Sequence, residues 1–162
     1  SQLAEYLIKD QRSITYIATS KPRENDPEWE QRIMVHRDRR PDNWKLLEHP
    51  HNLLKSINRL GKNESILIDS LGGLVEQYLK EDNGKWELFQ SEFVRSLIDN
   101  NLGIILVADE IGWGIVPSTQ IGHLFRERHS KLLALLSSHA SKRILAVNGI
   151  AIDLDKVGFS IP

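Results

Sequence analysis

Ser65-Ile66-Leu67-Ile68-Asp69 is a short apolar run that begins with a serine and ends in a carboxylate. A run with so little polar alternation is typical of a strand that is buried on both faces of a parallel sheet. Three further runs have the same character, at residues 13–19, 103–109 and 143–148. We therefore expect four strands in one mainly parallel sheet, with their carboxyl ends on the same side.

Helical patterns separate these runs. Asp26-Pro27 is a good helix start, and Trp29, Ile33 and His36 follow at a spacing that places them on one face. Apolar residues also repeat at helical spacing within 71–78, within 86–97 and within 121–136, where Pro117 is the expected first helical residue. Strands that alternate with helices predict an α/β domain with helices on both faces of the sheet.

Length and composition exclude several classes of protein. The 162 residues predict one domain spanning 1–162, and the net charge of −1 gives no reason to expect a nucleic-acid partner. The chain contains no cysteine, no apolar run long enough to span a membrane and no signal-peptide pattern. We therefore expect a cytoplasmic protein. Three histidines fall on one long helix and are expected to be solvated, with no structural metal: His123, His129 and His139.

Polar residues follow the expected strands at their carboxyl ends, where α/β sheets bind ligands. These residues are Thr19-Ser20, Asp69-Ser70 and Asp109-Glu110. Asp69 has the form of a Walker B acid, which holds Mg²⁺ directly or through water. An alternative reading is that the carboxylate caps the following helix.

A histidine stands among arginines in the segment Val35-His36-Arg37-Asp38-Arg39-Arg40-Pro41. Forked guanidinium donors match phosphate oxygens, and an imidazole beside them is suited to attack a phosphate. The three arginines also favour the uncharged imidazole that such an attack needs. The alternative is a solvated helix end with cations near the negative pole of its dipole.

These residues together resemble the adenosylcobinamide kinase/adenosylcobinamide-phosphate guanylyltransferase family. The loop Asp109-Glu110-Ile111-Gly112-Trp113-Gly114-Ile115-Val116-Pro117, followed by Phe125-Arg126, is similar to the family's Asn-Glu-Val-Gly-x-Gly-Ile-Val-Pro and Phe-Arg-Asp motifs. Tyr16-Ile17-Ala18-Thr19 matches as well, as does the segment from His36 to Pro41 with Trp44 and Glu48. The resemblance implies a P-loop NTPase-like (RecA-like) fold.

The resemblance also implies two activities in cobalamin biosynthesis, with Mg²⁺ and GTP or ATP. One phosphorylates adenosylcobinamide, and the other transfers GMP from GTP to adenosylcobinamide phosphate through a guanylylated histidine. The position of that catalytic histidine matches His36, while Ser1 and Asp69 match metal-binding positions. A homotrimer is implied too. The remaining nucleotide-binding positions implied here are Thr19, Ser20, Arg39, Arg40, Pro41 and Glu48, together with Ser1 and Asp69 themselves.

The chain departs from the family's pattern at several points. Ser1 matches the last residue of a Gly-x-x-x-x-Gly-Lys-Ser loop, so the first strand and the P-loop are missing; either the protein is truncated or, as we expect, the sequence is a fragment. A chain without that loop is expected to bind triphosphate poorly. Gly72-Gly73 replaces a Thr-Thr-type pair, and Asp109 replaces an asparagine. Two alternatives therefore stay open: a degenerate paralogue that binds nucleotide or a partner without catalysis, and an unrelated kinase or α/β module.

Overall fold

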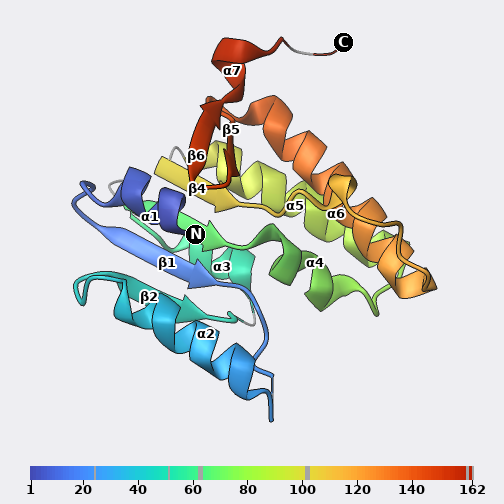
Figure 1. Cartoon of the computed structure of the whole chain (residues 1–162), viewed down its shortest axis with the longest axis horizontal. Coiled ribbons are helices and arrows are strands. Elements are labelled where there is room, and N and C mark those ends of the chain that lie inside the picture. The colour runs from blue at the N-terminus through green and yellow to red at the C-terminus, as the bar shows by residue number, and fades with distance from the viewer. Residues whose placement is uncertain (24, 51, 62–63, 101–102, 160, 162) are drawn as a thin grey trace.

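A four-stranded parallel sheet forms the centre of the computed structural model, which describes residues 1–23, 25–50, 52–61, 64–100, 103–159 and 161 (Figure 1). Its order is β2-β1-β3-β4. Ile17 of β1 pairs in register with Leu47 on one side and Ile68 on the other. The two inner strands are buried on both faces, which explains their continuous apolar runs. The strands span β1 Ile14–Ala18, β2 Lys45–Glu48, β3 Ser65–Asp69 and β4 Gly103–Val107.

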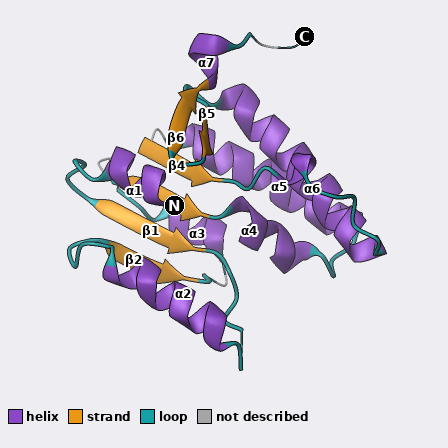
Figure 2. Cartoon of the chain, in the orientation of Figure 1, coloured by secondary structure: helices purple, strands orange, loops and turns teal. Residues whose placement is uncertain are grey.

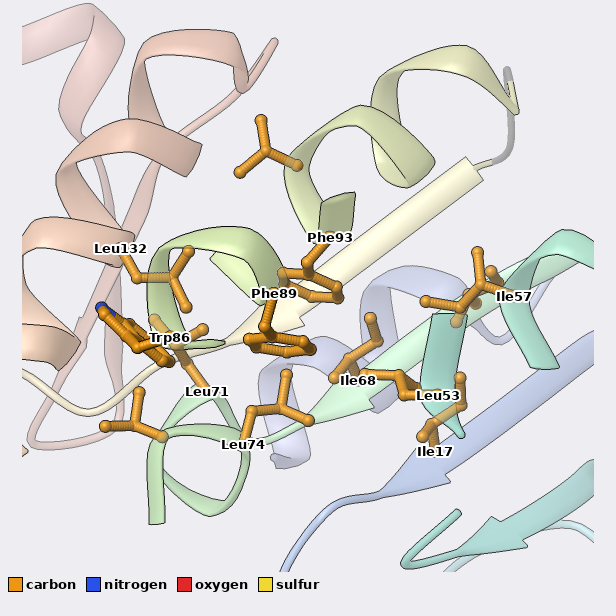
Figure 3. Close-up of a cluster of buried hydrophobic side chains, with 13 residues drawn as sticks. Ile17, Leu53, Ile57, Ile68, Leu71, Leu74, Trp86, Phe89, Phe93 and Leu132 are labelled. Atoms are coloured by element: carbon orange, nitrogen blue, oxygen red, sulfur yellow. The ribbon is translucent and has the colours of Figure 1, made fainter. Parts of the chain in front are cut away.

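One face of the sheet carries the larger core, under four helices (Figure 2). They are α3 Leu53–Asn58, α4 Leu71–Tyr78, α5 Asn83–Asp99 and α6 Gln120–His139. Ile17 and Ile68 project from the sheet into an aromatic and aliphatic cluster, with Phe89 and Phe93 at its centre (Figure 3). The burial of large apolar side chains here is the main stabilising contribution to the fold.

The opposite face is covered by α1 Gln2–Ile8. Ala4 and Ile8 pack against Ile14, Tyr16 and Leu67 of the inner strands. The second helix, α2 Pro27–Asp38, lies next to β2 and begins where the sequence predicts, because Asp26 accepts a hydrogen bond from the amide of Trp29 (Figure 1). The expected parallel α/β sheet with helices on both faces is confirmed.

The prediction for the fourth strand is wrong. Residues 143–148 do not join the main sheet; β5 Ile144–Val147 instead pairs antiparallel with β6 Ile150–Asp153. The two strands meet at Asn148-Gly149, whose φ angles are +48° and +78°. Left-handed conformations at both central residues are those of a type I′ hairpin turn, which returns the chain immediately. The hairpin leads into α7 Leu154–Val157.

The long helix differs from the prediction in two ways. It begins at Gln120 rather than at Pro117, because the hydroxyl of Thr119 accepts a hydrogen bond from the amide of Gly122 and caps the first turn. His129 is not solvated: its side chain is fully buried and lies against Phe125, with 5.7 Å between ring centroids. His123 and His139 are exposed as expected.

Arg128 fixes the long helix to the end of α4. Its side chain is buried and donates hydrogen bonds to the carbonyls of Tyr78 and Glu81, and its guanidinium lies 5.3 Å from the centre of the Trp86 ring. The carbonyls at a helix end lack partners within the helix, so a guanidinium is a good donor for them. Across the described ranges, we find no helix with the length and apolar character needed to cross a membrane.

Candidate functional site

Asp69 lies at the carboxyl end of β3 and binds two hydroxyl groups. Its Oδ2 accepts a hydrogen bond of 2.6 Å from Ser1, directly before α1, and one of 2.5 Å from Tyr16 in the neighbouring strand. Burial raises the pKa of the Tyr16 hydroxyl, and the charge of Asp69 raises it further. Tyr16 therefore stays a neutral donor, and the two hydrogen bonds to one oxygen fix the orientation of the carboxylate.

Thr19 connects the end of β1 to the start of α4. Its buried hydroxyl donates to the carbonyl of Ser70 at 2.7 Å and accepts from the amide of Ser70 at 2.9 Å. Gln77 donates to the carbonyl of Thr19 at 2.9 Å. The Thr19 side chain thus lies inside the fold, next to Asp69, whereas Ser20 is exposed.

The close approach of Thr19 requires a glycine at position 73 of this chain. A Cβ atom added to Gly73 would lie 2.4 Å from Oγ1 of Thr19 and 2.8 Å from the amide nitrogen of Ser20. Both contacts are far too short for a real Cβ, so α4 approaches the end of β1 only with a glycine at this position. At Gly72 the nearest contact would be 3.4 Å, an ordinary distance, to Asp109.

His36 lies in the last turn of α2, on the face of the helix that is half-buried. Its Nδ1 is 3.3 Å from Nη2 of Arg39, which also binds Glu5 of α1 at 3.3 Å. Arg40 donates from Nε to the backbone carbonyl of His36 at 2.9 Å, and its guanidinium lies 4.2 Å from the centre of the Tyr16 ring. These contacts hold the histidine segment against α1 and against the tyrosine that binds Asp69.

The pKa of His36 is lowered, mainly by burial and then by the charge of Arg39. Asp69 and Glu5 act in the opposite direction and moderate the shift. Of the three arginines expected to lower this pKa, Arg39 is the one whose charge does so. Arg37 instead forms an exposed ion pair with Glu48 at 3.3 Å. The net result favours an uncharged imidazole, the form that can act as a nucleophile.

A hollow of about 130 Å³ lies beside this segment. Arg40 is one of its lining residues, and Nη1 of this guanidinium is buried without a hydrogen-bond partner in the described part of the chain. A guanidinium in the lining of the hollow is a good donor for an anionic oxygen. The volume fits a phosphate-sized group and is smaller than a pocket for a whole nucleotide. The hollow is lined by Tyr16, Arg37, Arg40, Pro41, Asp42 and Trp44, among others.

The structure therefore brings Ser1, Asp69 and the segment from His36 to Arg40 together on the α1 side of the sheet. Thr19 adjoins them from within the fold, and Glu48 reaches the segment through Arg37. Pro41 lies at the surface, where its carbonyl accepts a hydrogen bond from the amide of Trp44.

The glycine-containing loop after β4 forms a 3₁₀ turn, η1 Ile111–Trp113. Trp113 is 71% exposed and Ile115 is 97% exposed.

Two residues of this arrangement were not predicted from the sequence as site residues. Tyr16 was recognised only as part of a matching strand, although a tyrosine inside an apolar strand needs a polar partner for its hydroxyl, which is a usable signal. Glu5 pairs with Arg39 across 34 positions, and nothing in the local pattern indicates that contact.

The oxygen ligands at Asp69 suit a magnesium ion. Among the residues described, no three His, Cys, Asp or Glu side chains converge as a metal-binding cluster would require. Mg²⁺ does not need such a cluster, because it is usually held by one or two carboxylates together with waters and substrate phosphates. The carboxylate of Asp69 and the hydroxyl of Ser1 match that donor set.

Comparison with known proteins shows the family to which the chain belongs. The sequence pattern of the family described as "Cobinamide kinase / cobinamide phosphate guanyltransferase" matches residues 1–154. The chain is 30% identical to the bifunctional adenosylcobalamin biosynthesis protein CobU of Escherichia coli (strain K12), over 95% of this chain and 92% of that protein. It is 29% identical to CobU of Salmonella typhimurium over the same shares, and 29% identical to CobP of Pseudomonas aeruginosa over 95% of this chain and 90% of that protein. The chain therefore belongs to the cobinamide kinase / cobinamide phosphate guanyltransferase family.

Proposed function

We propose that the protein phosphorylates adenosylcobinamide and transfers GMP from GTP to adenosylcobinamide phosphate, with His36 as the residue that carries the GMP. The observation that supports this most directly is an imidazole with a lowered pKa, 3.3 Å from an arginine and within the electrostatic influence of Asp69. The names of the Escherichia coli and Salmonella relatives, both bifunctional adenosylcobalamin biosynthesis proteins, point to the same pathway.

The contact between His36 and Arg39 fixes the tautomer of the ring. A guanidinium has N–H donors and no acceptor, so Nδ1 of His36 must be the acceptor in this contact. The neutral ring therefore carries its proton on Nε2 and its lone pair on Nδ1. Arg39 frees that lone pair when its donor turns to a phosphate oxygen of the bound nucleotide. The same movement prepares the nucleophile and adds a positive charge beside the triphosphate.

The transfer then proceeds in two displacements. Nδ1 of His36 forms a bond to the α-phosphorus of GTP while the bond to the leaving pyrophosphate breaks, and the ring loses its Nε2 proton to water. A phosphate oxygen of the acceptor next attacks the same phosphorus, the phosphorus–nitrogen bond breaks, and the ring takes a proton back. The products are adenosylcobinamide-GDP and a histidine ready for another cycle.

Mg²⁺ would be held by Asp69 and Ser1, where it would offset the negative charge of the phosphates. Tyr16 keeps the carboxylate in a fixed orientation through its hydroxyl. Arg40, placed over the Tyr16 ring, lines the adjoining hollow, and its guanidinium is suited to a phosphate oxygen.

The alternative is a degenerate member of the family that binds nucleotide without catalysis. Incubation of the full-length protein with Mg²⁺, GTP and adenosylcobinamide phosphate separates the two. The proposed function predicts adenosylcobinamide-GDP and an equal amount of pyrophosphate. GTP binding without either product would favour the degenerate member.

A further inference from the structure

A second and larger hollow, of about 480 Å³, lies on the other side of the sheet, beyond the carboxyl ends of β1 and β2. Its walls come from α4, α5 and the start of α3, and it is open on one side. Leu54, Leu88 and the stacked rings of Tyr78 and Phe89, 4.1 Å apart, form an apolar floor. The volume is within the range of small-molecule pockets, and the position is where α/β sheets bind their ligands.

The charges around this pocket balance. Lys21 and Lys85 contribute two positive charges, and Glu81 and Glu92 contribute two negative charges. Glu81 and Lys85 already pair with each other at 2.8 Å. A triphosphate would gain little from such a rim, in contrast to the hollow that Arg37 and Arg40 line. Hydrogen-bond donors and acceptors beside an apolar lining suit a large ligand that carries amide groups and little net charge.

We propose that this pocket binds one edge of the corrin ring of the cobinamide substrate, an inference that rests on the proposed function. A corrinoid is an extended apolar macrocycle with acetamide and propionamide side chains around its edge. The ring edge would lie on Leu54, Leu88 and Phe89, while its amides exchange hydrogen bonds with the charged rim. Because the pocket is open on one side, the rest of the macrocycle remains outside it.

Two lining residues connect the pocket to the catalytic side of the sheet, one through hydrogen bonds and one through its neighbour in the chain. Gln77, which lines the pocket, donates to the carbonyl of Thr19, and Thr19 binds Ser70 next to Asp69. His49, another lining residue, directly follows Glu48, whose carboxylate binds Arg37 beside His36. A corrinoid held here lies at the same strand ends as the phosphate chemistry, so its flexible aminopropanol arm is free to reach across the sheet edge.

Leu88→Arg tests the pocket, because Leu88 lines it and is 59% exposed, outside the buried core. An arginine would fill the floor with a charge. Ile98→Arg is the matched control: it is also an exposed apolar residue of α5, 51% exposed, and it does not line the pocket. Calorimetric titration with dicyanocobinamide should show affinity at least about tenfold weaker for Leu88→Arg, a loss of about 1.4 kcal/mol, and unchanged for Ile98→Arg.

Tryptophan fluorescence gives an independent readout. Trp86 lies next to two lining residues, Tyr78 and Phe89, at 6.0 and 5.9 Å between ring centroids. A corrinoid absorbs light where tryptophan emits. Dicyanocobinamide should quench the wild type strongly, and Trp86→Phe should lose most of that quenching. Equal affinity of wild type and Leu88→Arg, or no dicyanocobinamide binding by the wild type, would overturn the pocket assignment.

The experiment separates failure of the pocket from failure of the proposed function. Guanylylation of His36 needs GTP and no corrinoid, so Leu88→Arg should take up label from GTP as the wild type does while transferring it slowly to the acceptor. Absence of label in the wild type would count against the proposed function. The dicyanocobinamide titration, which needs neither GTP nor His36, would still decide whether the pocket binds corrinoid.

Discussion

The hydroxyl of Tyr16 donates a 2.5 Å hydrogen bond to Oδ2 of Asp69, across two neighbouring strands. The same tyrosine ring carries the guanidinium of Arg40, which in turn binds the backbone of His36. One buried side chain thus connects the carboxylate proposed to hold Mg²⁺ with the segment proposed to carry GMP. The two halves of the site are therefore fixed relative to each other by the sheet.

Removing the Tyr16 hydroxyl should impair magnesium-dependent activity without unfolding the protein. In Tyr16→Phe, Asp69 loses one of two charge-assisted hydrogen bonds, each worth about 1.5–3 kcal/mol. We expect turnover to fall by about tenfold and the Mg²⁺ concentration for half-maximal activity to rise, measured by a magnesium titration of pyrophosphate release. Tyr6→Phe, at a tyrosine that is 64% exposed, is the control and should leave both values unchanged.

The two adjacent glycines of α4 should respond oppositely to alanine. Gly73→Ala places a Cβ against Thr19 and the backbone of Ser20, and overpacking of this kind lowers the free energy of unfolding by about 1–3 kcal/mol. Gly72→Ala meets only ordinary contacts and should leave stability unchanged or raise it by up to about 1 kcal/mol. Urea unfolding of both variants measures the difference. A Gly73→Ala protein as stable as the wild type would show that α4 does not pack as tightly as described.

His129 should make the protein sensitive to acid. Burial lowers its pKa, although Asp109 and Glu110 oppose the shift, and its two ring nitrogens lack hydrogen-bond partners within the described residues. The unfolded chain therefore binds a proton more readily than the folded one. The contribution of neutral His129 to the free energy of unfolding is complete above the pKa of the unfolded chain, about 6.5. Below that pH it decreases by about 1.4 kcal/mol per pH unit, until the pH reaches the lower pKa of the folded protein.

His129→Leu should remove this part of the pH dependence. Denaturant unfolding between about pH 7.5 and 5 should then show a smaller decrease in the free energy of unfolding for His129→Leu than for the wild type. His139→Gln changes an exposed histidine of the same helix and should keep the wild-type slope. If His129→Leu and the wild type lose stability in parallel, His129 is not buried in its neutral form.

Guanylylation should persist to a lower pH than an ordinary histidine allows. The pKa of His36 is lowered by burial and by Arg39, against the opposing charges of Asp69 and Glu5. Labelling should therefore fall only as the pH drops through a midpoint below 6.5, where the imidazole becomes protonated. Arg39→Gln removes a positive neighbour, so its midpoint should move upward even though its maximum rate falls. An unchanged or lower midpoint in Arg39→Gln would contradict the electrostatic role of Arg39.

The sequence predicted the inner strands well, because a strand buried on both faces must be apolar throughout. β2 was missed for the opposite reason: Lys45-Leu46-Leu47-Glu48 is an edge strand with only two apolar residues, and its pairing with β1 depends on distant contacts. β5 was placed in the wrong sheet because Ile-Leu-Ala-Val fits any apolar strand. Asn148-Gly149, the usual pair for a tight hairpin turn, was the available signal.

The site was predictable to the extent that it follows from strand ends and a helix end. Asp69 and His36 were expected at such positions, and the structure places them there. The contacts that join them were not predictable, since the Arg39–Glu5 pair and the stacking of Arg40 on Tyr16 depend on how α2 packs against the sheet. Local sequence gives no register for that packing. His129 was misjudged because a single histidine on an amphipathic helix gives little indication of which face it occupies.

The central claim is that His36 carries GMP, and the direct measurement is label retained on the protein after incubation with Mg²⁺ and GTP labelled at the α-phosphate. The wild type should retain label that is released by acid and stable in base, as a phosphorus–nitrogen bond requires. His36→Ala should retain none, while His123→Ala, at an exposed histidine, should match the wild type. Wild-type labelling in His36→Ala, or no label on the wild type, would contradict the account.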